Sequence, residues 1–117
     1  MENKRILIVD DESDICEILR YNLEKAGYSA DISLSAEDAL LRGLSSYDLI
    51  LLDVMMEGIS GFQMAEMMKK NPGTASIPVI FITAKDREED VVHGLETGAY
   101  DYIRKPFSVK EVVLRVG

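Results

Sequence analysis

Residues 47–61 decide the fold, and they read YDLILLDVMMEGISG. Residues 49–52 form an unbroken apolar run in which polar and apolar side chains do not alternate. Such a run is typical of a central strand of a parallel sheet, because other elements cover both of its faces. The run ends at Asp53, and a carboxylate is costly inside an apolar sheet. We therefore expect Asp53 at the carboxyl end of the strand, followed by a loop that Gly58 and Gly61 permit.

The bulk composition indicates one globular domain. The chain has 117 residues, 47% hydrophobic and 29% charged, which is long enough to bury a core without a disulfide or metal. Its net charge of −8 disfavours direct binding to nucleic acid or to an anionic membrane. The single cysteine, Cys16, is expected to be a small apolar filler of a helix. With no signal peptide and no apolar run near the ~20 residues of a membrane helix, we expect a cytoplasmic protein.

Four further segments carry strand signals, and a helical pattern follows each strand. These strands are expected at residues 5–9, 28–32, 77–82 and 99–103, and the weakest, 28–32, is expected near a sheet edge. Alternating strands and helices with right-handed crossovers predict an α/β fold, a three-layer sandwich. Five parallel strands suit the flavodoxin-like order 2-1-3-4-5, whose crevice lies between the first and third strands.

Helix boundaries follow from capping signals. Ser13 or Asp14 is expected to cap the first helix, and Ser35 the second, whose apolar positions run as far as Leu44. The last helix, residues 108–116, is short and has no end signal. We therefore expect a single domain over this chain that is cut short in its last helix, with a further domain following in the natural protein.

Polar side chains follow four of the strands at what should be one edge of the sheet: Asp10, Asp11, Asp53, Thr83 and Lys105. Two like charges about 4 Å apart repel by about 4 kcal/mol at an effective dielectric near 20, so either one carboxyl is protonated or a cation lies among them. A few hard oxygen ligands beside an open position favour Mg²⁺. Such a metal can hold a phosphoryl oxygen, and an aspartate can attack phosphorus.

This set of residues resembles the receiver domain of two-component response regulators over the whole chain. The motifs that carry the resemblance are Asp10-Asp11, Asp53, Thr83-Ala84 and Lys105-Pro106-Phe107. The resemblance implies that Asp53 accepts a phosphoryl group from the phosphohistidine of a sensor histidine kinase or from a small phosphodonor. It also implies that Asp11, Asp53 and the backbone carbonyl of Met55 bind Mg²⁺, while Asp10 holds the ion through water.

The resemblance further implies a switch. Lys105 would pair with the phosphoryl oxygens and Thr83 would hydrogen-bond one of them, while Tyr102 rotates inward as Thr83 moves. The surface formed by the fourth helix, fifth strand and fifth helix would change shape in response.

Within the family, the chain is most similar to OmpR/PhoB-type transcription regulators. In that group phosphorylation produces a symmetric dimer, and Asp101, Glu111 and Arg115 match positions of its dimer face. The basic partner expected for Glu111 is replaced here by Val91. DNA would be bound by the missing output domain and not by this one.

One position departs from the family pattern: Glu57 stands where members usually carry proline. A proline would stiffen the loop after the acceptor, whereas glutamate leaves φ free and adds a negative charge. Glu57 is expected either to be a solvated loop residue or to change cation binding and phosphorylation modestly.

Three alternatives stay open. A receiver can signal alone by docking to a partner. A haloacid-dehalogenase-like phosphatase also uses a strand-end aspartate and Mg²⁺, but it needs a second acid where this chain has Met55. A flavodoxin-like flavin protein needs Ser, Thr and Gly in its first loop, where residues 10–12 are acidic. We therefore expect a phosphorylation switch and not a turnover enzyme, with the single histidine, His93, on a helix surface.

Met55 and Lys85 occupy the two positions that tune the lifetime of the phosphoryl group in the family. Because Met55 is bulky and apolar where a water must be aligned, self-dephosphorylation is expected to be slow. Met55→Asn should shorten the phosphoryl lifetime, measured as the decay of phosphorylated protein after removal of the donor. An unchanged lifetime would refute this role.

Overall fold

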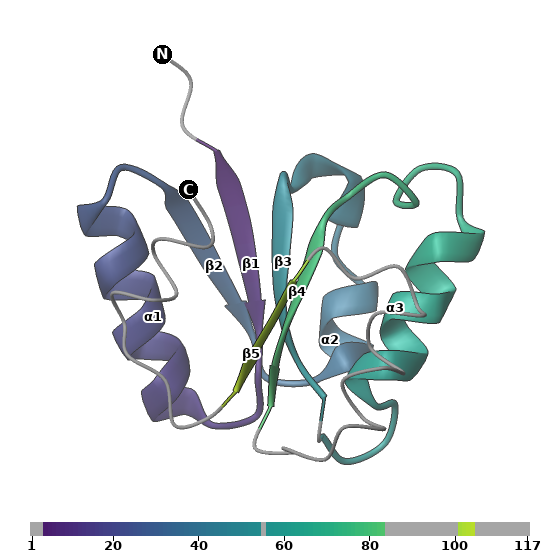
Figure 1. Ribbon diagram of the computed structural model, residues 1–117, viewed down its shortest axis with the longest axis horizontal. Helices are drawn as coiled ribbons and strands as arrows, with labels where there is room; N and C mark the ends of the chain where they lie inside the picture. The colour runs from purple at the N-terminus through teal and green to yellow at the C-terminus, as the bar shows by residue number, and fades with distance from the viewer. Residues whose placement is uncertain (1–3, 55, 84–100, 105–117) are drawn as a thin grey trace.

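The computed structural model describes residues 4–54, 56–83 and 101–104. Strands and helices alternate along this part of the chain (Figure 1). In order they are β1 (Arg5–Val9), α1 (Ser13–Lys25), β2 (Ser29–Ser33), α2 (Ala36–Leu40), the 3₁₀ helix η1 (Leu44–Ser46), β3 (Leu49–Asp53), α3 (Gly61–Lys70), β4 (Val79–Thr83) and β5 (Asp101–Arg104). The predicted strands are all present, and their ends differ by one or two residues, as ends commonly do.

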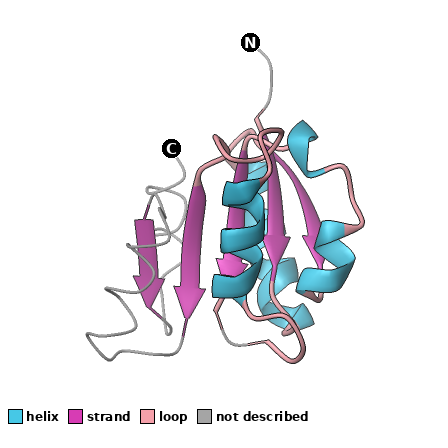
Figure 2. Ribbon diagram, turned by 90° about the vertical axis from the view of Figure 1, so that its right-hand side faces the viewer, coloured by secondary structure: helices cyan, strands magenta, loops and turns pink. Residues whose placement is uncertain are grey.

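The strands form one parallel sheet in the order β2-β1-β3-β4-β5, so the predicted flavodoxin-like topology is confirmed. Helix α1 covers one face of the sheet, and α2 and α3 cover the other (Figure 1). Figure 2, viewed from the side of α2 and α3, shows these helices in front of the strands. Strand β2 lies at an edge, as its weaker pattern predicted, and every residue of β3 is buried. No helix among the described residues is long and apolar enough to cross a membrane.

Successive side chains of the central strands enter two different cores. Ile8 and Leu51 pack on the face that α1 covers, whereas Val9 and Leu52 pack on the face that α2 and α3 cover. This period of two explains why the strand sequences are apolar without alternation. Burying each such aliphatic side chain contributes roughly 1.5–3 kcal/mol before entropy is counted, so the central strands form a rigid base for whatever lies at their ends.

Helix α1 begins one residue earlier than the capping signals predicted. Glu12 is its N-cap and makes no side-chain cap bond, so the expectation that Ser13 or Asp14 caps the helix is wrong. The backbone N–H of Glu12 instead donates to Asp10 Oδ1 at 2.9 Å. The carbonyl of Glu12 then accepts the first helical hydrogen bond, from the N–H of Cys16 at 3.1 Å. An acidic side chain at the strand end thus fixes the start of the helix.

Helix α2 is shorter than its apolar pattern predicted. Ser35 caps it as expected, accepting a hydrogen bond from the N–H of Asp38 at 3.0 Å. The helix ends at Leu40, and Leu44 belongs to the separate 3₁₀ helix η1, although its side chain is buried as the pattern required. Gly43 separates the two pieces with a non-helical backbone (φ −75°, ψ 80°).

Polar side chains connect the segment after α2 to the edge strand β2. Arg42 Nη2 donates to the carbonyl oxygen of Ile32, in β2, at 2.8 Å. The hydroxyl of Tyr47, just before β3, donates to Asp31 Oδ2 at 2.6 Å. The guanidinium of Arg5 lies 4.7 Å from the centre of the Tyr47 ring, within range of a cation–π contact. These bonds join β1, β2 and the approach to β3 through side chains.

Tyr47→Phe removes the hydroxyl that donates to Asp31. We expect the free energy of unfolding to fall by about 1–2 kcal/mol at neutral pH, less than for a fully buried charged partner because Asp31 is half exposed. Burial raises the pKa of Tyr47 above its usual range, and the hydrogen bond to Asp31 acts in the same direction. The wild-type advantage should therefore be complete below the ordinary tyrosine pKa of about 10 and shrink as pH rises through the raised value.

Urea unfolding of wild type and Tyr47→Phe, at neutral pH and through the alkaline range, measures this advantage. A difference that grows with pH would contradict the assignment.

Candidate acidic phosphoacceptor site

Strand register brings Asp10 and Asp53 to the same level of the sheet. Val9 and Leu52 are paired neighbours, and each aspartate is the next residue along its strand. The N–H of Asp10 still donates to the carbonyl of Ser33 at 3.1 Å, so strand pairing continues through it. By the period of two, both positions fall on the face that α1 covers. Both residues are buried, with exposures of 1% and 3%, as expected of carboxylates held in a crevice.

The first loop adds two further acids beside Asp10. Carboxylate oxygens of Asp10, Asp11 and Glu12 all lie within 4.8 Å of one another, and Asp11 and Glu12 are exposed. Below them, the thiol of buried Cys16 donates to the backbone carbonyl of Asp10 at 3.2 Å, so this cysteine is indeed a small interior residue of α1. Glu12 was not among the predicted ligands, although it directly follows two of them, Asp10 and Asp11.

This donor set fits a small divalent cation. Three carboxylates within 4.8 Å repel one another, and a cation among them relieves that repulsion. The donors are hard oxygens and two of the three are open to solvent, which suits an ion such as Mg²⁺ that keeps part of its water shell. Asp53, a predicted ligand, lies at the neighbouring strand end but is not one of the three residues of this carboxylate group.

Strand β4 brings one more predicted residue, Thr83, to this edge. Asp53 pairs with Ile82, so Thr83, the last residue of β4, lies one step beyond the level of Asp53. Thr83 in turn pairs with Arg104, the last residue of β5. Tyr102 pairs with Phe81 further back along the sheet. Strands β4 and β5 therefore end level with each other, one residue beyond β3, which places Thr83 at the carboxyl edge of the sheet.

The loop between β3 and α3 returns to the end of β3, where Gly61 packs against the backbone of Asp53 and Val54. The N–H of Gly61 donates to the carbonyl of Val54 at 3.1 Å. A Cβ atom on Gly61 would collide with the backbone oxygen of Asp53 and lie 2.9 Å from Val54 Cα. Helix α3 then starts with a capping box: the N–H of Gln63 donates to Ser60 Oγ at 3.2 Å, and the N–H of Ser60 donates to Gln63 Oε1 at 2.9 Å.

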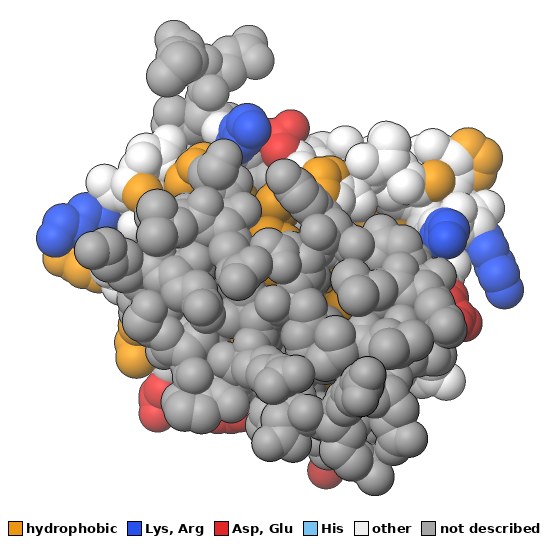
Figure 3. All heavy atoms as spheres, viewed as in Figure 1, with side chains coloured by type: hydrophobic (Ala, Val, Ile, Leu, Met, Phe, Trp, Pro, Cys, Tyr) orange, Lys and Arg blue, Asp and Glu red, His pale blue; other side chains and the backbone are white. Residues whose placement is uncertain are grey.

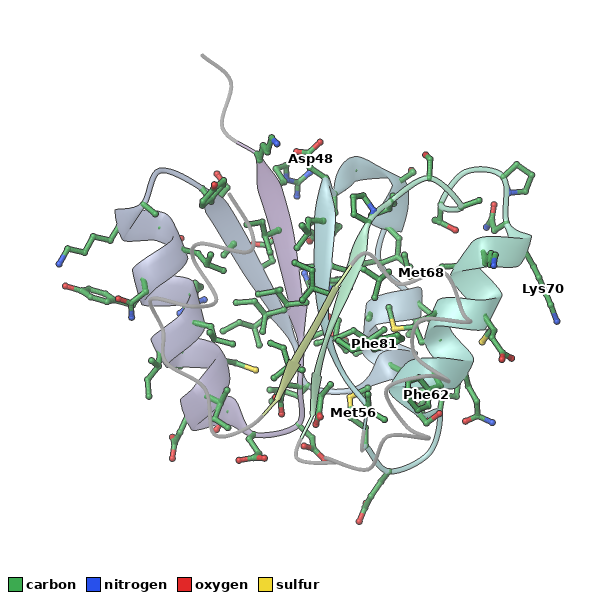
Figure 4. The ribbon with its side chains drawn as sticks, viewed as in Figure 1. Asp48, Met56, Phe62, Met68, Lys70 and Phe81 are labelled. Carbon is green, nitrogen blue, oxygen red and sulfur yellow. The ribbon has the colours of Figure 1, made fainter. Side chains whose placement is uncertain are left out.

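Apolar side chains anchor both ends of this loop to the core. Met56 and Ile59 pack against the cluster between the sheet and α3. Phe62 meets Phe81 of β4 edge to face, with ring centres 5.0 Å apart and planes at 79°. Figure 4 shows Met56, Phe62 and Phe81 gathered at the same place. Between the anchors Glu57 is exposed, which agrees with a solvated loop residue and leaves its effect on cation binding a prediction.

Both signs of charge appear on the described surface in Figure 3. Acidic side chains lie along the lower rim, the edge at which the strands end, and also at the top and on the right-hand side, where basic side chains lie beside them. Several predicted residues lie outside the described part of the chain: Met55, Lys85, Val91, His93, Lys105, Glu111 and Arg115. Thr83, Asp101 and Tyr102 are described through their backbone. The roles of all these side chains stay predictions.

Comparison with known proteins identifies the class that this fold and acidic edge define. Residues 6–117 match the response regulator receiver domain family, and the chain belongs to that family. Receiver domains of response regulators are signalling domains. The prediction that this chain is a response regulator receiver domain is thus confirmed.

Particular relatives refine the comparison. The chain is 45% identical over 113 residues to the transcriptional regulatory protein ResD of Bacillus subtilis, covering 96% of this chain and 46% of ResD. It is 44% identical over 115 residues to the alkaline phosphatase synthesis transcriptional regulatory protein PhoP of the same organism, covering 97% and 47%. The solved response regulator DrrB, an OmpR/PhoB homologue from Thermotoga maritima, superposes with a TM-score of 0.89 at 30% identity, covering 98% and 51%. These relatives confirm the OmpR/PhoB type, and the chain spans about half their length.

Gly61→Ala should distort the site from behind the acceptor, because the new Cβ meets backbone that cannot move aside. We expect the free energy of unfolding to fall by about 1–3 kcal/mol, as overpacking commonly costs. The affinity for Mg²⁺ should fall as well. Gly43→Ala is the matched control, since nothing lies within 4 Å of its added Cβ. Equal losses in the two variants, by denaturant unfolding and calorimetric titration, would refute the close approach at Gly61.

Proposed function

We propose that this receiver accepts a phosphoryl group on Asp53 from a sensor histidine kinase and that Mg²⁺ bound at the acidic edge supports the transfer. The observation that carries the proposal is the pairing of β1 with β3, which sets Asp10 and Asp53 side by side where the strands end. Asp53 is buried, and the acids of the first loop follow the neighbouring strand at the same edge of the sheet. An acidic acceptor needs a cation before an anionic phosphoryl group can approach.

The chemistry required of Asp53 is nucleophilic attack. One carboxylate oxygen forms a bond to phosphorus while the bond from phosphorus to the donor imidazole nitrogen breaks, and the nitrogen keeps the electron pair. Asp11, Asp53 and the backbone carbonyl of Met55 are the proposed ligands of Mg²⁺, with Asp10 acting through water. The ion supplies charge neutralisation of the phosphoryl oxygens when it is bound.

Thr83 and Lys105 are proposed to bind the phosphoryl group on Asp53 and so respond to its charge. A phosphoryl group adds about −1.5 to −2 charge, which a lysine ammonium and a threonine hydroxyl can bind. Thr83 ends β4 next to the acceptor level, and Tyr102 lies in the adjacent strand, which supports a path from the site to the surface around β5. The proposed movement of Thr83 would let Tyr102 turn inward and bias a two-state surface.

The output is proposed to be control of transcription through a dimer. Asp101, Glu111 and Arg115 would lie on the dimer face, and an exposed ion pair of this kind sets orientation more than affinity. Two relatives are named as transcriptional regulatory proteins, and the chain spans about half of each. The remaining half is proposed to hold the DNA-binding output domain.

Intact mass after incubation with Mg²⁺ and acetyl phosphate tests the acceptor. Wild type should gain one phosphoryl group, and Asp53→Ala should gain none. Asp48→Ala is the matched control, because Asp48 is an exposed aspartate at the opposite edge of the sheet (Figure 4). Chelation of Mg²⁺ should abolish the gain in wild type.

Phosphorylation of Asp53→Ala to the wild-type level would overturn the assignment. The dimer part is tested by sedimentation of wild type with beryllofluoride, an acyl phosphate mimic, which should double the mass of the particle. A protein that stays monomeric with beryllofluoride at high concentration would exclude that part alone.

A further inference from the structure

Glu37 reaches from α2 to the loop that follows the acceptor. It lies in the first turn of α2 and is separated from that loop by about twenty residues of chain. Its Oε2 accepts a hydrogen bond from the backbone N–H of Ile59 at 3.5 Å. The same carboxylate fills the place that a Cβ atom on residue 58 would occupy, with Glu37 Cδ 3.2 Å from that position.

Gly58 makes this contact possible in two ways. Its φ of +76° lies in the left-handed region, which glycine adopts at no steric cost. Its missing side chain leaves the space into which the carboxylate of Glu37 fits. The loop therefore turns at Gly58 and presents the next N–H, that of Ile59, to an acceptor on another element.

The contact adds a restraint at the Gly58 turn of the loop. The far end is held by the capping box at Ser60 and by the close approach of Gly61, and Ile59 packs on the core. Glu57 precedes the turn and is exposed. A proline at position 57 would fix φ through its ring, whereas glutamate leaves that torsion free. The hydrogen bond from Ile59 to Glu37 is thus a restraint that comes from another element and acts directly after the Gly58 turn.

Helix α2 holds Glu37 in a favourable place for this contact. The helix starts at Ala36, and the side chain of Ser35 caps it. Carboxylates are stabilised in the first turn of a helix by the unpaired N–H groups and the helix dipole. Asp38 occupies the same turn and carries the same charge, but its carboxylate faces Arg42, with Oδ2 3.6 Å from Nε.

We propose that Glu37 is a positioning residue for the cation site: its hydrogen bond to Ile59, across the space left by Gly58, holds the β3–α3 loop in the shape that Mg²⁺ binding beside Asp53 requires. The proposal rests on the proposed function, since it concerns the same site. A loop that is already ordered loses less conformational entropy when the ion binds, so removing the restraint weakens binding without touching a ligand.

Calorimetric titration of Mg²⁺ into matched variants tests the proposal. Glu37→Ala should bind Mg²⁺ about threefold to tenfold more weakly than wild type. This loss is smaller than the roughly 10–100-fold loss that follows removal of a residue hydrogen-bonded directly to a metal ligand, because Glu37 acts only through the loop. Glu37→Gln keeps an oxygen acceptor of the same reach and should restore most of the affinity. Asp38→Ala removes the same charge from the same turn and should bind as wild type does, and all variants should keep their melting temperature within a few degrees.

A double-mutant cycle sharpens the test. Adding Glu57→Pro supplies a restraint within the loop, so Glu37→Ala should cost less affinity in that background than in wild type. Hydrogen exchange of the Ile59 amide should quicken in Glu37→Ala and stay unchanged in Asp38→Ala. This exchange reports the contact whether or not Asp53 is an acceptor.

The outcomes separate the two proposals. Wild-type Mg²⁺ affinity in Glu37→Ala, or an equal loss in Asp38→Ala, would overturn the positioning role. If Asp53→Ala binds Mg²⁺ as wild type does and wild type gains no phosphoryl group, the proposed function fails instead, and the exchange rate of Ile59 still decides whether Glu37 restrains the loop.

Discussion

The structure depends on one constraint: parallel pairing of β1 with β3 forces two carboxylates to the same level, on the same face and at the same edge of a sheet. Neither strand can relieve the crowding by shifting, because a slip of one residue would turn every apolar side chain to the wrong face. Carboxylates about 4 Å apart repel by about 4 kcal/mol at an effective dielectric near 20, and by less where they are exposed to solvent, as Asp11 and Glu12 are. The apolar core therefore holds like charges together at this edge, and a cation bound there would relieve their repulsion.

The central strands and the acidic edge could be predicted because their signals are local. An unbroken apolar run from Leu49 that stops at Asp53 defines both a buried strand and its exit. The same reasoning applies to β1 and Asp10. The weaker pattern of β2 correctly predicted an edge position. The capping box at Ser60 was not predicted, although its signal is local, since Gln63 follows three residues later.

The remaining features of the site depend on contacts between segments that are distant along the chain. Periodicity shows which face of α2 is apolar, but it cannot show that Glu37 meets Ile59, or that the helix ends at Leu40 and leaves Leu44 to a separate turn. Nor can composition show that Gly61 lies directly on the backbone of Asp53. These contacts depend on how the helices and loops lie relative to the sheet. The sequence predicts the order of the elements but not the exact path of the loops that join them.

The bond from Arg42 to the carbonyl of Ile32 has a consequence for how copies of this chain meet. A strand at the margin of a sheet offers unpaired backbone groups to any other extended chain, and that offer is a common origin of fibrils and swapped assemblies. Here a cationic side chain occupies one of those acceptors on β2 and sets a repulsive charge in front of the margin. Pairing of this edge with the backbone of another extended chain is thereby disfavoured.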